Sequence, residues 1–164
     1  MENKIENNFC EIKNNNLKSQ LIQKNYGIKE DNLILKLDLF ETMYLFEKNK
    51  IKIKNISNIS ELEKYCLKKI KNFKDKYLVF KDFRNNGYII KDGLKFGFDF
   101  KIYENEKSKK HNHTKYVVDV KRSHKDQMSK IIKSERLANS IKTKYIVAII
   151  DLENKITKIK IERI

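Results

Sequence analysis

The stretch Asn86-Gly-Tyr-Ile-Ile-Lys-Asp-Gly-Leu-Lys-Phe-Gly-Phe-Asp-Phe-Lys-Ile-Tyr103 decides the fold of the second half of the chain. The stretch contains three of the four glycines of the chain, Gly87, Gly93 and Gly97, in a span of eleven residues. Glycine is used where the backbone needs positive φ or close approach. From Phe98 to Tyr103, apolar and polar residues alternate with a period of two. The stretch therefore predicts short strands joined by tight turns, with Tyr103 at a strand end, on the face opposite Phe98, Phe100 and Ile102.

A basic loop over residues 104–115 follows this strand and contains His111 and His113. Considered alone, Tyr103 fits a half-buried tyrosine in a strand, where tyrosine is common. Considered alone, His113 fits a solvated residue in a loop. Together they form a candidate acid–base pair for cutting RNA, because histidine titrates near neutral pH and donates a proton when charged.

The charge of the chain favours a polyanionic partner. The 164 residues carry a formal net charge of +15, and neutralisation of phosphates by lysine and arginine drives binding to nucleic acids. A Lys-, Asn- and Ile-rich composition also makes a chain basic without any such function, so charge leaves both interpretations open.

The compartment expected from the sequence is the cytoplasm. Cys10 and Cys66 form neither a disulfide nor a metal spacing, which fits a reducing environment. The start at Met1 lacks the apolar core of a secretory signal, and no apolar run reaches membrane-spanning length.

An α+β fold is predicted throughout, with an N-terminal α/β domain over residues 1–74 and a second domain over residues 75–164. In the first domain, Asp38 and Glu41 have the spacing of a helix capping box. Residues 33–37 and 51–55 are expected to be strands, and Ser60 is expected to cap a second helix.

The second domain is predicted to contain a mixed sheet. The uninterrupted apolar run from Tyr145 to Ile150 predicts a strand over residues 144–150 that is buried on both faces. The remaining elements are expected to be a helix around residues 77–80, strands over 88–91, 98–103 and 115–121, a helix over 126–140 and a last strand over 156–164.

The stretch from Tyr77 to Tyr103 resembles the catalytic domain of archaeal tRNA-splicing (tRNA-intron) endonucleases. The resemblance continues, in order and spacing, in His113-Thr-Lys-Tyr-Val-Val and in Arg136-Leu-Ala-Asn-Ser-Ile-Lys-Thr-Lys. It covers residues 25–164 and implies an N-terminal α/β domain, a C-terminal nuclease domain with a mixed sheet, and a homotetramer or a dimer-based assembly. It also implies metal-independent and cofactor-independent cleavage of precursor tRNA at a bulge–helix–bulge, which leaves a 2′,3′-cyclic phosphate and a 5′-hydroxyl.

The resemblance assigns roles to individual residues. Tyr103 is expected to act as the general base on the 2′-hydroxyl, and His113 as the general acid on the departing 5′-oxygen. Arg136 is expected to hold the bulged RNA. A phenol is a poor base unless cations favour its phenolate, and Lys101, Lys115 and Arg136 are the candidates for supplying that field.

The sequence departs from the family at Thr143, which stands where the catalytic lysine is expected. A threonine hydroxyl cannot supply the charge that stabilises the pentacoordinate phosphorus. Lys142 and Lys144 flank the position, and on a regular strand both would point away from the face of Thr143. Either a local bulge brings one of these lysines into the catalytic role or the subunit is slow. With a bulge, Lys144 is expected to take the catalytic role and Lys142 to bind RNA, and Lys142 is the alternative for catalysis.

The segment Asp151-Leu-Glu-Asn-Lys155 occupies the place of an acidic loop that docks on another subunit in the family. Opposite charges across such a contact help to fix the register of an assembly. The alternative is a plain hairpin turn, for which Asp and Asn are common.

Two other functions remain open. One is a metal-dependent, restriction-type nuclease, in which Asp99, Asp119 and Lys121 form the site and the carboxylates hold Mg²⁺. The other is a non-catalytic RNA-binding or structural subunit, which the absence of a lysine at Thr143 favours and the presence of Tyr103 and His113 disfavours.

Overall fold

The structure is a computed structural model that describes residues 3–30, 34–111, 113–122 and 128–164. The chain divides into two compact units, Met1–Phe73 and Lys74–Ile164. The predicted domain boundary between residues 74 and 75 lies next to this division. The α+β fold class expected from the sequence is confirmed, because both units combine helices with a sheet.

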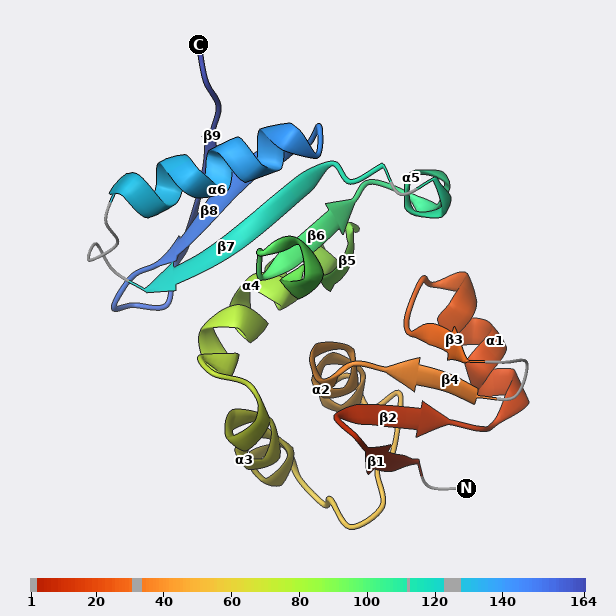
Figure 1. The fold of residues 1–164 in the computed structure, drawn as a ribbon. Coiled ribbons are helices and arrows are strands. Elements are labelled where there is room, and N and C mark those ends of the chain that lie inside the picture. The colour runs from red at the N-terminus through yellow and green to blue at the C-terminus, as the bar shows by residue number, and fades with distance from the viewer. Residues whose placement is uncertain (1–2, 31–33, 112, 123–127) are drawn as a thin grey trace. The chain divides into compact units, whose positions relative to one another are not determined.

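The N-terminal unit contains a four-stranded antiparallel sheet in the order β1-β2-β4-β3. Its elements, drawn from red to yellow in Figure 1, are β1 (Lys4–Glu6), β2 (Phe9–Ile12), α1 (Asn15–Gln23), β3 (Ile28–Glu30), β4 (Ile34–Leu37), α2 (Leu39–Glu47) and α3 (Ile59–Lys69). The core of the unit contains residues from the sheet and the helices, including Ile12, Leu35, Leu37 and Leu62, which are at most 1% exposed.

Local signals account for several elements of this unit. Asp38 caps α2 by accepting the N–H of Glu41 at 2.8 Å, and the Glu41 carboxylate accepts the N–H of Asp38 in return, which confirms the capping box. Asn7 and Asn8 both have positive φ, 48° and 68°, between the antiparallel strands β1 and β2. Two asparagines with positive φ suit a two-residue hairpin turn.

Two local predictions in this unit are wrong. Residues 51–55 do not form a regular strand: Ile53 makes only isolated bridges to Asn3 and Ile56, and Asn55 turns the chain at a φ of 62°. Helix α3 is capped by Asn58 and not by Ser60, because the Asn58 side chain accepts the N–H of Glu61 at 3.0 Å.

The C-terminal unit contains a five-stranded mixed sheet in the order β5-β6-β7-β8-β9, in which only β7 and β8 pair in parallel. The predicted mixed sheet is therefore confirmed. The elements are α4 (Phe73–Asn85), β5 (Ile89–Asp92), the 3₁₀ turn η1 (Leu94–Phe96), β6 (Phe100–Tyr103), α5 (Glu106–Lys110), β7 (Tyr116–Arg122), α6 (Met128–Ser140), β8 (Lys144–Ile150) and β9 (Ile156–Ile161).

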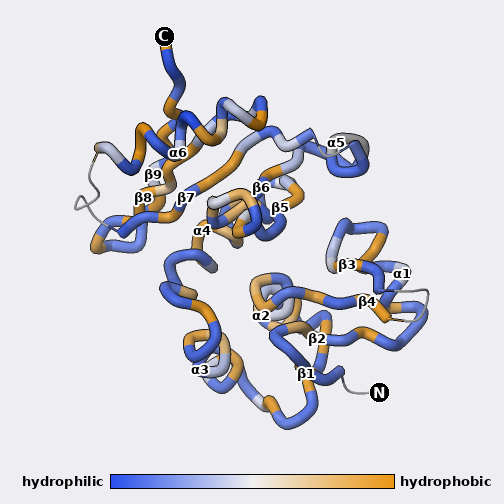
Figure 2. The backbone as a smooth tube through the Cα atoms, viewed as in Figure 1, coloured by the Kyte–Doolittle hydropathy of each residue, from blue (hydrophilic) through white to orange (hydrophobic). Residues whose placement is uncertain are grey.

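Strand β8 lies between β7 and β9, and its residues 145–148 are buried, as the apolar run predicts. Apolar residues run along β7 and β8, whereas the α5 segment is hydrophilic (Figure 2). The predicted helix over 126–140 is described from Met128 onward, and residues 126 and 127 lie outside the described residues.

Helices α4 and α6 lie on opposite sides of the C-terminal sheet (Figure 1). We call these sides the α4 face and the α6 face. Phe100 packs with Phe80 of α4, with ring centroids 6.2 Å apart. Phe98 instead joins a buried cluster with Ala138 of α6 and Tyr145 of β8. The prediction that Phe98 shares a face with Phe100 is wrong, because the chain becomes a regular strand only at Phe100.

Both cysteines are buried free thiols, and burial raises the pKa of Cys10 and of Cys66 to about 12. Neither thiol is therefore a reactive nucleophile at neutral pH. Among the described residues, no helix combines the length and the apolar character that crossing a membrane requires.

Candidate active site

Tyr103 ends β6 and is 5% exposed. Its cross-strand partner is Ile89 of β5. Residues directly opposite each other in a sheet point to the same face, and neighbours along a strand point to opposite faces. The side chains of Lys101, Val117 and Tyr145 lie in one cross-strand row, and Val117 and Tyr145 belong to the cluster with Ala138 of α6.

Lys101 and Tyr103 therefore point to the α6 face, opposite Ile102 and Phe100, as the alternating pattern predicts. The row of Ile102, Tyr116 and Lys144 lies on the α4 face. The register thus places the expected catalytic lysine, Lys144, on the other face of the sheet from Tyr103.

The two expected histidines lie beside each other after α5. His111 and His113 are both exposed, and their ring centroids are 6.2 Å apart. The predicted loop over residues 104–115 contains the short helix α5, which the sequence reading did not anticipate. Exposed imidazoles at this position are accessible to a large substrate such as RNA.

Lys115 joins the histidine segment to the segment that carries Tyr103. Its backbone N–H donates to the carbonyl of Ile102 at 2.8 Å, and its ammonium donates to the Glu104 carboxylate at 2.6 Å. This hydrogen bond raises the pKa of Lys115. Because the two acceptors flank Tyr103 and the donor lies two residues after His113, the expected base and acid come from adjacent segments at one end of the sheet.

Helix α6 ends in a Schellman motif around Lys142. The N–H of Lys142 donates to the carbonyl of Asn139 at 3.0 Å, and the N–H of Thr143 donates to that of Ala138 at 3.1 Å. Lys142 has a φ of 55°, a left-handed conformation that costs a non-glycine residue about 1 kcal/mol. Among the described residues, the same hydrogen-bond pattern closes the α-helices α1, α2 and α4, with Asn25, Asn49 and Gly87 in the left-handed position.

Lys142 therefore lies outside the regular strand, so the alternation of β8 does not decide where its side chain points. Thr143 has a separate role in the geometry. Its hydroxyl donates to the carbonyl of Thr114 at 3.0 Å and so attaches the start of β8 to the residue that follows His113.

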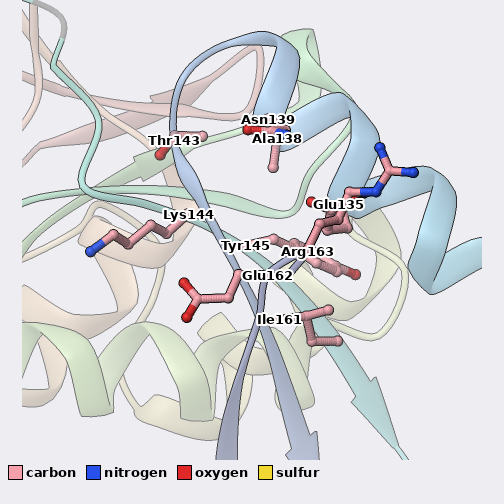
Figure 3. Close-up of a pocket in the computed structure, with 9 residues that line it drawn as sticks. All are labelled: Glu135, Ala138, Asn139, Thr143, Lys144, Tyr145, Ile161, Glu162 and Arg163. Carbon is pink, nitrogen blue, oxygen red and sulfur yellow. Dashed lines mark ion pairs between the residues drawn. The ribbon is translucent and has the colours of Figure 1, made fainter.

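Arg136 is exposed on α6. The C-terminal part of this helix, the start of β8 and the end of β9 enclose a pocket of about 250 Å³ (Figure 3). Its lining includes Glu135 and Arg163, which pair at 3.6 Å, together with Thr143 and Lys144. In Figure 3, the Lys144 ammonium and the Arg163 guanidinium extend to opposite sides.

Partners from the sheet and from helices α4 and α6 occupy the carboxylates of the alternative metal site. Asp99 pairs with Lys76 at 2.7 Å and accepts the N–H of Val120 at 2.8 Å. Asp119 is 9% exposed and accepts the hydroxyls of Tyr145 and Ser134 at 2.8 and 3.1 Å.

Burial raises the pKa of the Asp119 carboxyl, against the lowering effect of the Tyr145 hydrogen bond. Across the part of the chain that the structure describes, no three His, Cys, Asp or Glu side chains group as ligands for a metal ion.

The acidic loop between β8 and β9 is held by Arg122, which the sequence reading did not single out. Arg122 pairs with Asp75 of α4 at 2.7 Å and donates to the Asp151 carbonyl at 3.2 Å and to the Asn154 side chain at 2.8 Å. Leu152 at the loop tip is 91% exposed. The loop is thus a rigid turn that presents an acidic and apolar tip.

Comparison with known proteins agrees with a two-unit nuclease. Residues 73–158 match the family model described as tRNA intron endonuclease, catalytic C-terminal domain. Residues 1–66 match the model described as tRNA intron endonuclease, N-terminal domain.

Curated relatives are similar over most of the chain. Proteins named tRNA-splicing endonuclease are 33% identical in Methanococcus vannielii (84% of this chain, 80% of the relative), 36% identical in Methanothermobacter thermautotrophicus (75% and 74%) and 33% identical in Thermococcus onnurineus (88% and 85%). The chain therefore belongs to the tRNA intron endonuclease family. The predicted family, its catalytic domain and its endonuclease class are confirmed.

Proposed function

We propose that this chain cleaves precursor tRNA at the bulge–helix–bulge structures that bound an intron, without a metal or another cofactor, and leaves a 2′,3′-cyclic phosphate and a 5′-hydroxyl. The observation that carries the proposal is the bridge made by Lys115. It joins the Ile102 carbonyl and the Glu104 carboxylate, one residue on each side of Tyr103, to the segment of His113, as a base and an acid acting on one phosphodiester require.

In the proposed reaction, the phenolate of Tyr103 takes the proton of the 2′-hydroxyl while the 2′-oxygen forms a bond to phosphorus. The bond from phosphorus to the 5′-oxygen breaks, and His113 in its charged form gives that oxygen a proton. The exposure of His113 supports the assignment, because an exposed side chain is accessible to the RNA.

Lys144 is proposed to neutralise the charge that develops on the phosphate, and Arg136 and Lys142 to bind the RNA. All three side chains are exposed. Since Lys144 lies on the α4 face, its role requires the RNA to pass around the end of the sheet.

For the assembly, we propose a homotetramer or a dimer-based equivalent that uses the loop from Asp151 to Glu153. The Arg122 contacts support this assignment, since a preorganised loop loses less entropy on docking. We also propose that the two compact units fold as separate domains. The proposed location is the cytoplasm, and the two free thiols support it.

The test is cleavage of an intron-bearing precursor tRNA by the purified chain in EDTA, followed by identification of the new ends. We expect cleavage at both intron boundaries, with cyclic phosphate and 5′-hydroxyl ends. Cleavage that requires a divalent metal and leaves a 5′-phosphate would favour the restriction-type alternative. Binding without cleavage, restored by adding a second subunit, would favour the non-catalytic one.

A further inference from the structure

Lys101 is a buried lysine whose ammonium lies against two aromatic rings. The residue is 8% exposed, and its Nζ lies 4.2 Å from the ring centroid of Phe96 and 5.4 Å from that of Tyr103. Burying an ammonium is costly unless other groups compensate for the lost water. The electron-rich faces of the two rings are part of that compensation.

The glycine-rich stretch builds this arrangement. A Cβ at Gly93 would lie 2.9 Å from the carbonyl oxygen of Phe98 and from the carbonyl carbon of Phe100, so only glycine fits there. Gly93 also accepts the N–H groups of Phe96 and Phe98 at 2.9 and 3.2 Å. The turn that places the Phe96 ring against the Lys101 ammonium is therefore held by contacts of Gly93 with Phe98 and Phe100, which lead into strand β6.

A cation over the ring of Tyr103 interacts differently with the two forms of the phenol. The phenolate spreads its negative charge over the ring, so the ammonium is attracted more strongly to the phenolate than to the neutral phenol. Lys101 is two residues before Tyr103 on the same strand face, which keeps this contact local to β6.

The other candidate cations are placed less well for this task. The ammonium of Lys115 is bound to Glu104 and lies over the rings of Tyr88 and Tyr116, 5.4 and 5.5 Å from their centroids. Arg136 is exposed on α6, where water screens its charge.

We propose that Lys101 is a positioning residue that favours the phenolate of Tyr103 and thereby makes this tyrosine an effective base. The inference rests on the proposed function. Tyr103 gives its phenolic proton to water before the reaction and takes the proton of the 2′-hydroxyl during it, while Lys101 keeps its own protons. Lys101 thus acts on the RNA only through Tyr103.

The first test compares single-turnover cleavage rates at saturating protein for wild type, Lys101→Met and Lys101→Arg. We expect Lys101→Met to cleave about 10- to 100-fold more slowly, with little change in the RNA dissociation constant, and Lys101→Arg to recover most of the rate because it keeps the charge. Lys91→Met is the matched control, since Lys91 pairs with Lys101 in the sheet register, and it should cleave at close to the wild-type rate.

The second test places 3,5-difluorotyrosine at position 103. This phenol ionises more readily, so it needs the cation less. We expect Lys101→Met to slow the fluorinated protein much less than it slows the protein with tyrosine. A purely structural lysine would slow both equally, and that result, or an unchanged rate for Lys101→Met, overturns the inference. Wild-type protein that cleaves no precursor tRNA contradicts the proposed function itself, so the two failures are distinguishable.

Discussion

The two faces of the C-terminal sheet carry similar lysine–tyrosine clusters in different surroundings. On the α6 face, the Lys101 ammonium lies 5.4 Å from the ring centroid of Tyr103, and both residues are buried. On the α4 face, Lys115 lies 5.4 Å from the ring of Tyr88, and its ammonium is bound to a carboxylate.

The comparison shows that proximity of a cation to a tyrosine is a weak criterion for a catalytic base. The Glu104 carboxylate pairs with Lys115, whose side chain is 30% exposed, so the partner charge and water both screen the field of Lys115 at the neighbouring phenols. Lys101 is shielded from water, and its field is therefore stronger at the ring beside it. Substitutions on the two faces should therefore differ in their effect on cleavage if the α6 face is the catalytic one.

The largest expected effect is that of Tyr103→Phe. Removing the phenolic oxygen removes the proposed base, and we expect the single-turnover rate to fall about 1,000-fold. Tyr116→Phe is the matched control on the α4 face and should cleave at close to the wild-type rate, with both variants melting within a few degrees of wild type. Equal losses in the two variants would contradict the distinction between the faces.

The substitution His113→Ala should come next, with a rate about 100-fold below wild type, because the leaving 5′-oxygen would then depart without a positioned acid. His111→Ala provides the comparison within the same segment and should retain most of the activity. If His111→Ala is the slower variant, the acid is His111 and the assignment of His113 fails.

Lys144→Met should lower the rate about 10-fold through weaker stabilisation of the charged phosphate. Lys142→Met should mainly weaken RNA binding and reduce the salt dependence of the dissociation constant. The measurements are single-turnover rates and filter binding across salt concentrations. A full rate for Lys144→Met with a strong rate loss for Lys142→Met would exchange the two roles.

Asp119→Asn should leave the cleavage rate close to that of wild type, because the carboxylate contacts Tyr145 and Ser134 and has no proposed role in the reaction. A metal-dependent site at Asp99 and Asp119 would lose its activity in this variant. A comparison of the thermal unfolding of wild type and Asp119→Asn also tests the pKa of the Asp119 carboxyl in the wild-type chain.

Burial raises the folded-state pKa of Asp119 above the unfolded value, so the folded chain holds this proton to higher pH. The resulting stabilisation is present below the unfolded pKa, about 3.9, and is lost as the pH rises through the folded pKa. The melting temperature of wild type relative to Asp119→Asn should therefore fall as the pH rises from about 4 toward neutrality. A constant difference would show that the carboxyl titrates normally.

Sequence patterns were sufficient where one local signal decides the structure. The apolar run before Ile150 predicted a central strand, and the spacing of Asp38 and Glu41 predicted a capped helix. The pattern also placed Lys101 and Tyr103 on one strand face. The position of Phe98 was not predictable, because the turn at Gly93 changes the alternation before the strand begins.

Long-range contacts decided the rest of the site. The pairing of Lys115 with Glu104 and the ring of Phe96 over Lys101 depend on how the turns are arranged in space. The sequence identified Lys142 and Lys144 as alternatives, but the Schellman motif at Lys142 and the regular register of Lys144 became visible only in the fold.

A precursor tRNA with sulfur in place of the 5′-bridging oxygen at the cleavage site tests the central claim most directly, because a thiolate leaves without a proton. If Tyr103 is the base and His113 the acid at one phosphodiester, this substrate should restore His113→Ala to nearly the wild-type rate and leave Tyr103→Phe slow. Restoration of Tyr103→Phe, or of neither variant, would contradict the account.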